Sequence, residues 1–152
     1  MNIKTVDLKI IDWLRRSYLP IARGAVFIIY FYFGLLKLLG DSPATPLAHA
    51  LADKTIGAAN FDVAFTILAI FECIIGILFL FPKLTRIVIP LLLIHMIIVC
   101  SPLFLLPGQA FTKPFVPTLE GQYIIKNVAI IALAIGVAAQ TPPLRGKRTG
   151  KH

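Results

Sequence analysis

Four long apolar runs occupy most of the chain, and its polar residues are concentrated between them and at the two ends. A bilayer core of about 30 Å requires ~20 apolar residues in an α-helix, and each run meets that length. The pattern therefore predicts an integral membrane protein with four spanning helices. These helices are expected at Pro20–Leu39, Phe61–Phe81, Leu84–Leu106 and Gly121–Ala139.

A different pattern precedes the first run. Up to Leu19, apolar residues recur at helical spacing and charged residues fill much of the opposite face, as in helices that lie in the membrane interface. We expect residues 1–19 to form such an amphipathic helix, which anchors the protein and sets its depth. Pro20 then suits the first turn of the spanning helix. The apolar positions are Ile3, Val6, Ile10, Trp13 and Leu14.

The connections between the runs differ in length and chemistry. The turn Pro82–Lys83 is tight, so the second and third spans must be antiparallel neighbours. The connection Gly40–Asn60 contains the stretch Leu47–Ala52, which favours a short amphipathic helix across the mouth of the bundle. The connection Pro107–Leu119 is rich in proline, glycine and aromatic residues, which predicts a fixed, non-helical cap.

Together these patterns predict an all-α fold, namely a four-helix membrane bundle with an N-terminal interfacial amphipathic helix. Residues 1–19 form the interfacial helix, residues 20–139 the transmembrane domain, and residues 140–152 a basic cytoplasmic tail. Composition supports the membrane assignment, since 58% of the residues are hydrophobic and only 14% are charged. A soluble domain of this length needs more polar surface than that. An enzyme that works in water on its own is therefore not expected.

The net charge of +8 resembles that of a nucleic-acid-binding protein until the basic residues are placed along the chain. Ten of them fall on one side of the predicted membrane, whereas the connections on the other side carry only Lys54 and Lys113. Because positive residues stay cytoplasmic, both termini are expected in the cytoplasm. The charge then reflects topology and attraction to anionic lipid headgroups, so no nucleic-acid partner is expected. The ten residues are Lys4, Lys9, Arg15, Arg16, Lys83, Arg86, Arg145, Lys147, Arg148 and Lys151.

Two ionisable residues are predicted to lie near the middle of the bilayer. At ~1.5 Å per residue, Glu72 in the second span and His95 in the third are both roughly 16 Å from the outer ends of their helices. An isolated carboxylate at that depth costs at least a few kcal/mol, so we expect Glu72 and His95 to face each other inside the bundle. The pair would serve either as a proton-coupled or headgroup-binding site in a cavity, or as a buried hydrogen bond that fixes helix register.

A second polar group is predicted nearer the outer face. Lys37 is about one turn from the end of the first span, where its long side chain can extend outward to the interface. Glu120, Tyr123 and Lys126 follow one another at three-residue steps and share one face at the start of the fourth span. Lys126 is too far along the helix from Glu120 to pair with it, so it requires a ligand or a partner from another helix. The partners that the sequence offers are Glu72 and the carbonyl oxygens freed by Pro102 or Pro107. The candidate ligand-binding residues are therefore Glu72, His95, Lys126, Lys37 and Tyr123.

Other chemistries find little support in the sequence. Cys73 and Cys100 both lie in spans and differ in predicted depth by roughly 9 Å, which is beyond disulfide reach. A single intramembrane histidine makes no metal-ligand set, and a haem held by two histidines would need another at the same depth. Arg23 lies near the inner face, where it can pair with headgroups. We identify no cofactor-binding motif, so any electron transfer would need a partner protein.

Several short motifs in these spans resemble the DoxX-like family of small membrane proteins. The stretch Arg23–Leu38 is similar to the first span of that family, which opens with Arg and closes with Gly-x-x-Lys. Glu72 followed by Gly76–Leu78 is similar to its second span. The stretch Glu120–Asn127 resembles the start of the fourth span in DoxX-like relatives, including the hypochlorite-response membrane proteins. The resemblance covers residues 20–139.

This resemblance implies a left-handed type of four-helix bundle in the bacterial inner membrane, with both termini in the cytoplasm. Some DoxX-like proteins look like small subunits of quinone-linked sulfur oxidation, and others are associated with oxidative-stress resistance as partners of redox enzymes. The group also contains relatives that use cysteine pairs, and the separated cysteines of this chain depart from that pattern. This departure argues against thiol chemistry and leaves contact with quinone or lipid open.

The residues and the resemblance together lead to three candidate functions. The leading expectation is an accessory subunit of a membrane redox or oxidative-stress system that binds a quinone or lipid-like ligand through the candidate residues. The first alternative is a purely structural subunit that helps to assemble a larger membrane complex. The second is a small transporter of an anion or weak acid, which would use Lys126 and Arg23 and, with so few helices, would work as a homo-oligomer.

Overall fold

The computed structural model describes residues 3–143, and four long helices form its framework. They are α1 (Ile3–Leu39), α3 (Phe61–Phe79), α4 (Thr85–Cys100) and α7 (Leu119–Ala139). With the short helical turns that adjoin them, all four are long and apolar enough to cross a membrane. The prediction of an all-α fold with four helices long and apolar enough to span a membrane is therefore confirmed. Most of the predicted basic tail lies outside the described residues.

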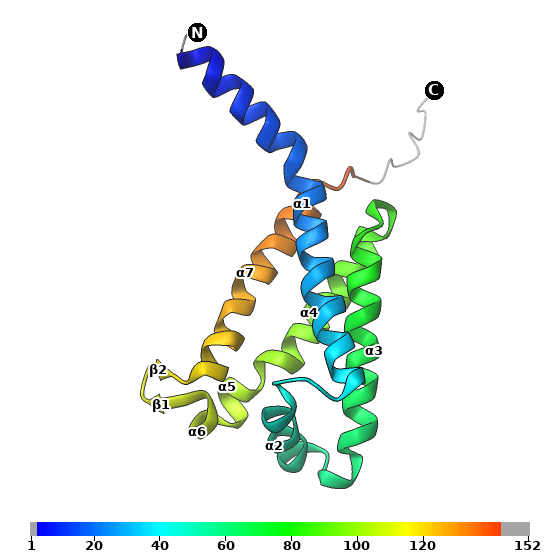
Figure 1. The fold of residues 1–152 in the computed structure, drawn as a ribbon, viewed down its shortest axis with the longest axis vertical. Coiled ribbons are helices and arrows are strands. Elements are labelled where there is room, and N and C mark those ends of the chain that lie inside the picture. Colours follow the sequence, from blue (N-terminus) through cyan, green and yellow to red (C-terminus); the bar gives the residue numbers. More distant parts are fainter. Residues whose placement is uncertain (1–2, 144–152) are drawn as a thin grey trace, which may run out of the picture.

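The four long helices form a ring in which helices adjacent in sequence are antiparallel (Figure 1). The α1 helix packs most extensively on α3, α3 also packs on α4, α4 packs on α7, and α7 contacts α1. The first helix begins and the last one ends at the same end of the bundle (Figure 1). We call this the basic end, and it also holds the turn η2 (Pro82–Leu84) between α3 and α4.

The opposite end, which we call the loop end, is built from the longer connections. Lys54 donates a hydrogen bond to the Leu105 carbonyl oxygen at 2.7 Å and so ties two of these connections together. The Thr118 hydroxyl accepts a hydrogen bond from the Gly121 amide at 3.1 Å and caps the start of α7. The elements here are α2 (Thr45–Thr55), η1 (Ala58–Asn60), α5 (Pro102–Leu105), α6 (Pro107–Ala110) and an antiparallel hairpin of β1 (Phe111–Lys113) and β2 (Val116–Pro117).

Two expectations for the loop end had different outcomes. The stretch Leu47–Ala52 lies inside α2, so the predicted short helix is confirmed. The cap predicted over Pro107–Leu119 is not wholly non-helical, because its first four residues form the helical turn α6. Proline is favoured in the first turn of a helix, where its missing N–H would have no partner anyway. For the same reason Pro102 begins α5, and the regular α4 helix ends at Cys100.

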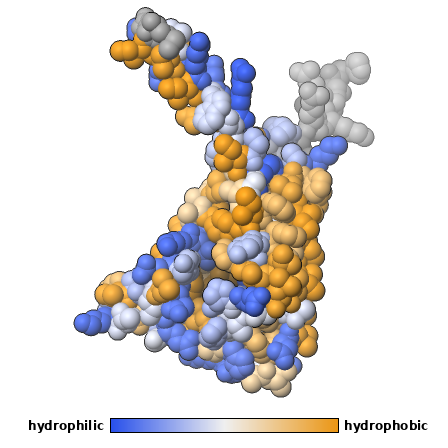
Figure 2. Space-filling view, in the orientation of Figure 1, coloured by the Kyte–Doolittle hydropathy of each residue, from blue (hydrophilic) through white to orange (hydrophobic). Residues whose placement is uncertain are grey.

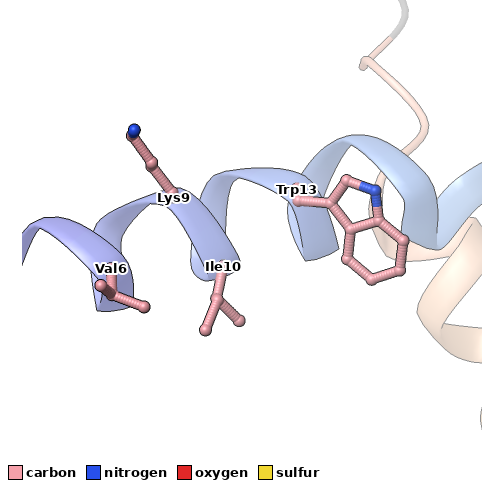
Figure 3. Close-up of a pocket in the computed structure, with 4 residues that line it drawn as sticks. All are labelled: Val6, Lys9, Ile10 and Trp13. Carbon is pink, nitrogen blue, oxygen red and sulfur yellow. The ribbon is translucent and has the colours of Figure 1, made fainter.

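The first part of α1 does not form a separate helix, contrary to the prediction. The helix continues through Pro20, which lies in its interior rather than in a first turn. An interior proline removes one hydrogen bond and crowds the preceding turn, which bends a helix without necessarily ending it. Figure 1 shows the first part of α1 projecting beyond the bundle at an angle to the rest. Figure 3 shows Val6 and Ile10 directed to one side of this segment and Lys9 to the other, whereas its place in the interface stays a prediction.

The spans turn most of their surface outward. Only 17–28% of the residues in the apolar stretch of each span are buried inside the protein. On the face shown in Figure 2, hydrophobic side chains cover much of the bundle, and hydrophilic ones are most numerous towards its two ends. This distribution suits a protein whose middle is surrounded by lipid. The core is small and consists of Ala22, Val26, Tyr30, Ile75, Phe79, Val88, Leu92, Met96, Ala134 and Val137.

Two glycines allow α1 and α3 to approach each other closely. A Cβ atom added at Gly34 would lie 2.8 Å from the Cys73 sulfur and 2.9 Å from the Ala69 carbonyl oxygen. A Cβ atom added at Gly76 would lie 2.9 Å from the backbone nitrogen of Phe31. In lipid, where apolar burial gives no drive for association, close backbone packing of this kind holds helices together. These two positions therefore set the spacing between α1 and α3.

Replacing Gly76 by alanine should push α1 away from α3. We expect the Gly76→Ala variant to lose about 1–3 kcal/mol of unfolding free energy, because the new methyl group meets backbone that cannot rotate aside. Gly24→Ala is the matched control, since a Cβ atom there meets nothing within 4 Å. The measurement is denaturant-induced unfolding in detergent, followed by circular dichroism. Equal losses for the two variants would contradict the role assigned to Gly76.

Candidate functional site

Four polar side chains from three helices form one hydrogen-bonded cluster inside the bundle. Lys37 of α1 contacts Glu72 Oε2 of α3 through its Nζ atom at 2.5 Å. The other carboxylate oxygen, Oε1, is 2.9 Å from His95 Nε2 of α4. The His95 Nδ1 atom is in turn 3.3 Å from the hydroxyl of Tyr30. This series of hydrogen bonds therefore begins and ends on α1. We call these four residues the polar cluster.

The spacing of residues along each helix explains how the polar cluster assembles. Tyr30, Gly34 and Lys37 are four and three residues apart, so they share one face of α1. Glu72 and Gly76 share one face of α3 for the same reason. The two glycine positions bring these faces close enough for the lysine and the carboxylate to meet. The adjacent helix α4 then supplies the imidazole from its buried side.

Burial makes the pairing within the polar cluster necessary. The exposed fraction is 5% for Glu72, 3% for His95 and 4% for Tyr30, and that of the Lys37 side chain is 9%. Removing a carboxylate or an ammonium group from water costs several kcal/mol unless an opposite charge and hydrogen bonds replace the solvent. Both oxygens of Glu72 are hydrogen-bonded, one of them to a lysine. The cluster therefore accommodates a charged carboxylate inside the bundle.

The contacts of His95 define a consistent direction of hydrogen bonding. Since a carboxylate only accepts, the Nε2 atom donates to Glu72, and in the neutral imidazole the Nδ1 atom accepts from the Tyr30 hydroxyl. The rings of Tyr30 and Phe71 also contact the imidazole, with centroids at 5.2 and 6.1 Å. These contacts hold the ring in place between the phenol and the carboxylate. Such a chain can pass a proton from one member to the next, and the Lys37 ammonium group can donate to an acceptor on a ligand.

The structure brings together three of the five predicted site residues. Glu72 and His95 face each other, so that expectation is confirmed. Lys37 does not extend outward, because it reaches the carboxylate inside the bundle. Lys126 and Tyr123 lie apart from the cluster with exposed side chains, and the Lys126 ammonium sits 4.8 Å from the centre of the Tyr123 ring. The expectation that Lys126 takes a partner from another helix is replaced by this contact within α7.

Sequence reasoning missed Tyr30. The signal was present, because Tyr30 precedes Lys37 by seven residues, which is two helical turns, and so lies on the same face. In a span with many aromatic residues, however, this spacing alone does not single out one tyrosine. Tyr32 lies two residues further along the same helix and is exposed. Tyr32 also lies on a different face from Lys37, but which face points inward depends on helix rotation. Only the contact with His95 on the neighbouring helix shows that Tyr30 belongs to the cluster.

Arg23 also has a different role from the one predicted. It is buried at the basic end, where it donates to the Phe79 carbonyl oxygen at 2.9 Å and to the Thr85 hydroxyl at 2.6 Å. These contacts fasten α1 to the junction between α3 and α4. Its guanidinium thus binds protein acceptors rather than projecting to the headgroups.

The cysteines and the acidic residues form no further centre in the described part of the chain. Cys73 and Cys100 are free thiols. Within residues 3–143, no group of three histidine, cysteine, aspartate or glutamate side chains is arranged to hold a metal ion. No family model, curated protein or solved structure matches the chain. The polar cluster is therefore the candidate functional site within the described residues.

Removing the lysine of the polar cluster should destabilise the bundle. We expect Lys37→Met to lower the unfolding free energy by about 3 kcal/mol, because it leaves the Glu72 carboxylate buried without its opposite charge. Adding Glu72→Gln to that variant should recover part of the loss, since the amide is neutral. Unfolding in detergent measures both effects.

Lys126→Met removes the same charge from an exposed side chain and serves as the control for this prediction. Its effect should stay within about 0.5 kcal/mol. The unfolding free energy lost by the double variant Lys37→Met/Glu72→Gln is compared with the sum of the losses in Lys37→Met and Glu72→Gln. If the two are equal, the lysine and the carboxylate are not coupled.

Proposed function

We propose that this chain is an accessory subunit of a membrane redox or oxidative-stress system and a member of the DoxX-like group. In this proposal it binds a quinone, or a lipid-like ligand of similar shape, with the polar head of the ligand against the polar cluster. The observation that carries the proposal is the hydrogen-bonded chain of Lys37, Glu72, His95 and Tyr30 in the interior of an apolar bundle. Two of the DoxX-like motifs meet there, since one contains Lys37 and the other contains Glu72.

The chemistry of quinones fits the groups in the polar cluster. A quinone presents two carbonyl oxygens on an apolar body, so its site needs an apolar slot and one or two hydrogen-bond donors. When a quinone takes up two electrons it also takes up two protons and becomes a quinol. Lys37 would donate to a carbonyl oxygen, and the chain from Tyr30 through His95 to Glu72 would pass protons. The two electrons would come from a partner redox protein.

A structural subunit is the second candidate, and one observation favours it. Every oxygen and nitrogen atom at the ends of the Glu72 and His95 side chains already has a partner within the protein. A cluster satisfied in this way fixes the rotation of α1, α3 and α4 without any ligand. The transport alternative has no comparable support, because Arg23 is bound at the basic end and Lys126 lies on the exposed side of α7.

We also propose an orientation and an environment. The basic end would face the cytoplasm of a bacterial cell and the loop end the outside, so that both termini are cytoplasmic. The apolar outer faces of the spans would contact the bilayer and other membrane or redox subunits. A homo-oligomer is compatible with the same faces, and nucleic acid is not a proposed partner.

Quinone binding is tested by native mass spectrometry of protein extracted gently from its own membrane. The wild type should carry an adduct with the mass of a quinone, and Glu72→Gln should lose most of it. Glu120→Gln makes the same chemical change at an exposed residue outside the polar cluster and should retain the adduct. A wild type without any small-molecule adduct, in a stable larger complex that Glu72→Gln preserves, would establish the structural role instead.

The orientation is tested by labelling introduced cysteines in intact cells with a maleimide that does not cross membranes. Lys113→Cys in β1 should react, because this exposed residue lies at the loop end. Lys83→Cys, which is exposed in η2 at the basic end, should react only after the cells are opened. The variant Cys73→Ala/Cys100→Ala provides the background for both. The reverse pattern of labelling would place the basic end outside.

A further inference from the structure

A groove of about 450 Å³ lies between α4 and α7 at the basic end, far from the polar cluster along the bundle. The start of α4 forms one wall, and the end of α7 with the residues after it forms the other. Six residues line the groove, namely Thr85, Arg86, Ile89, Pro90, Ala138 and Thr141.

The lining of the groove is arranged in two layers. Thr85 and Arg86 lie in the first turn of α4, and Thr141 follows the end of α7, so the polar side chains occupy the rim. The apolar residues of both walls lie about one turn further into the membrane, because the two helices run in opposite directions. A polar rim above an apolar layer is the order found in a phospholipid, whose glycerophosphate headgroup lies above its acyl chains.

The charge around the groove is positive. Arg86 donates one hydrogen bond to the Pro142 carbonyl oxygen at 2.6 Å, and its side chain is otherwise exposed at the rim. Behind the wall, the Arg23 guanidinium is hydrogen-bonded to the hydroxyl of Thr85, which itself lines the groove. No carboxylate within residues 3–143 forms a salt bridge with either arginine.

Arg23 is the stronger indication that an anion belongs here. Its exposed fraction is 7%, and its Nε atom is the one buried side-chain nitrogen or oxygen without a hydrogen-bond partner in the described part of the chain. Its two other nitrogens bind a carbonyl oxygen and a hydroxyl, which carry no charge. A buried guanidinium without a counter-ion is costly, and a nearby phosphate reduces that cost.

We propose that this groove binds one phospholipid with a net negative headgroup. The phosphate would accept hydrogen bonds from Arg86 and from the Thr141 hydroxyl at the rim, and the positive charge of Arg23 would attract it through the wall. The Thr85 hydroxyl already donates to the Pro82 carbonyl oxygen, so it forms part of the wall only. The upper part of an acyl chain would pack against Ile89, Pro90 and Ala138. Anionic lipids are concentrated in the cytoplasmic leaflet, which the basic end would face.

Lipid titration of the purified full chain, followed by native mass spectrometry, tests this proposal. Phosphatidylglycerol should bind in a one-to-one complex and phosphatidylcholine more weakly. Arg86→Gln should weaken phosphatidylglycerol binding roughly ten-fold or more, because it removes a charge-assisted hydrogen bond. Lys83→Gln removes the same charge from the neighbouring turn outside the groove and should change the affinity less than two-fold.

A second variant tests the lower layer of the groove. Ala138→Phe keeps every charge and fills the apolar layer, so it should also weaken binding of phosphatidylglycerol several-fold while helix content measured by circular dichroism stays unchanged. Equal losses for Arg86→Gln and Lys83→Gln would show diffuse attraction to the basic end and overturn the proposal. Release of the lipid by millimolar inorganic phosphate would identify a site for soluble anions, which would also overturn it.

Discussion

The arrangement of three of the four spans depends on the Glu72 carboxylate between them. Water cannot solvate a charge in the interior of a membrane bundle, so the groups that stabilise the charge must come from neighbouring helices. Lys37 supplies one partner from α1 and His95 the other from α4, and each uses a different oxygen. These two contacts fix the rotation of α1 and α4 about α3, which apolar side chains alone would leave loosely defined. Gly34 and Gly76 make this possible by allowing α1 close to α3.

Arg23 performs a related task where α1 enters the bundle at the basic end, with a different electrostatic result. At the loop-end side of the helix a lysine meets a carboxylate, so the two charges cancel. At the basic end the arginine meets a carbonyl oxygen and a hydroxyl, so its charge remains. Both contacts fasten α1 to α3 or its junction with α4, but only the second leaves a net charge inside the bundle. The two proposals, a neutral quinone at the polar cluster and an anionic lipid at the basic end, follow from that difference.

The spans and the meeting of Glu72 with His95 could be predicted from sequence, because both follow from length, depth and the cost of a buried charge. The partner of Lys37 could not be predicted from sequence. A lysine near a helix end can reach water or turn inward, and the choice depends on a carboxylate 35 positions away whose direction depends on helix rotation. Pro20 was misjudged for another reason. Proline suits a first helical turn but is also tolerated inside a long helix, and local sequence does not separate the two cases.

A cluster whose groups are all paired is not thereby closed to a ligand. Glu72 and His95 have their terminal atoms engaged, so a ligand that bound either of them would have to replace an existing hydrogen bond. Lys37 differs, because an ammonium group has three N–H donors and the contact with Glu72 uses one. A ligand carbonyl approaching Lys37 would therefore add a bond without breaking the chain. Lys37, which stabilises the bundle, is thus also the group that can bind a ligand without the loss of a hydrogen bond in the polar cluster.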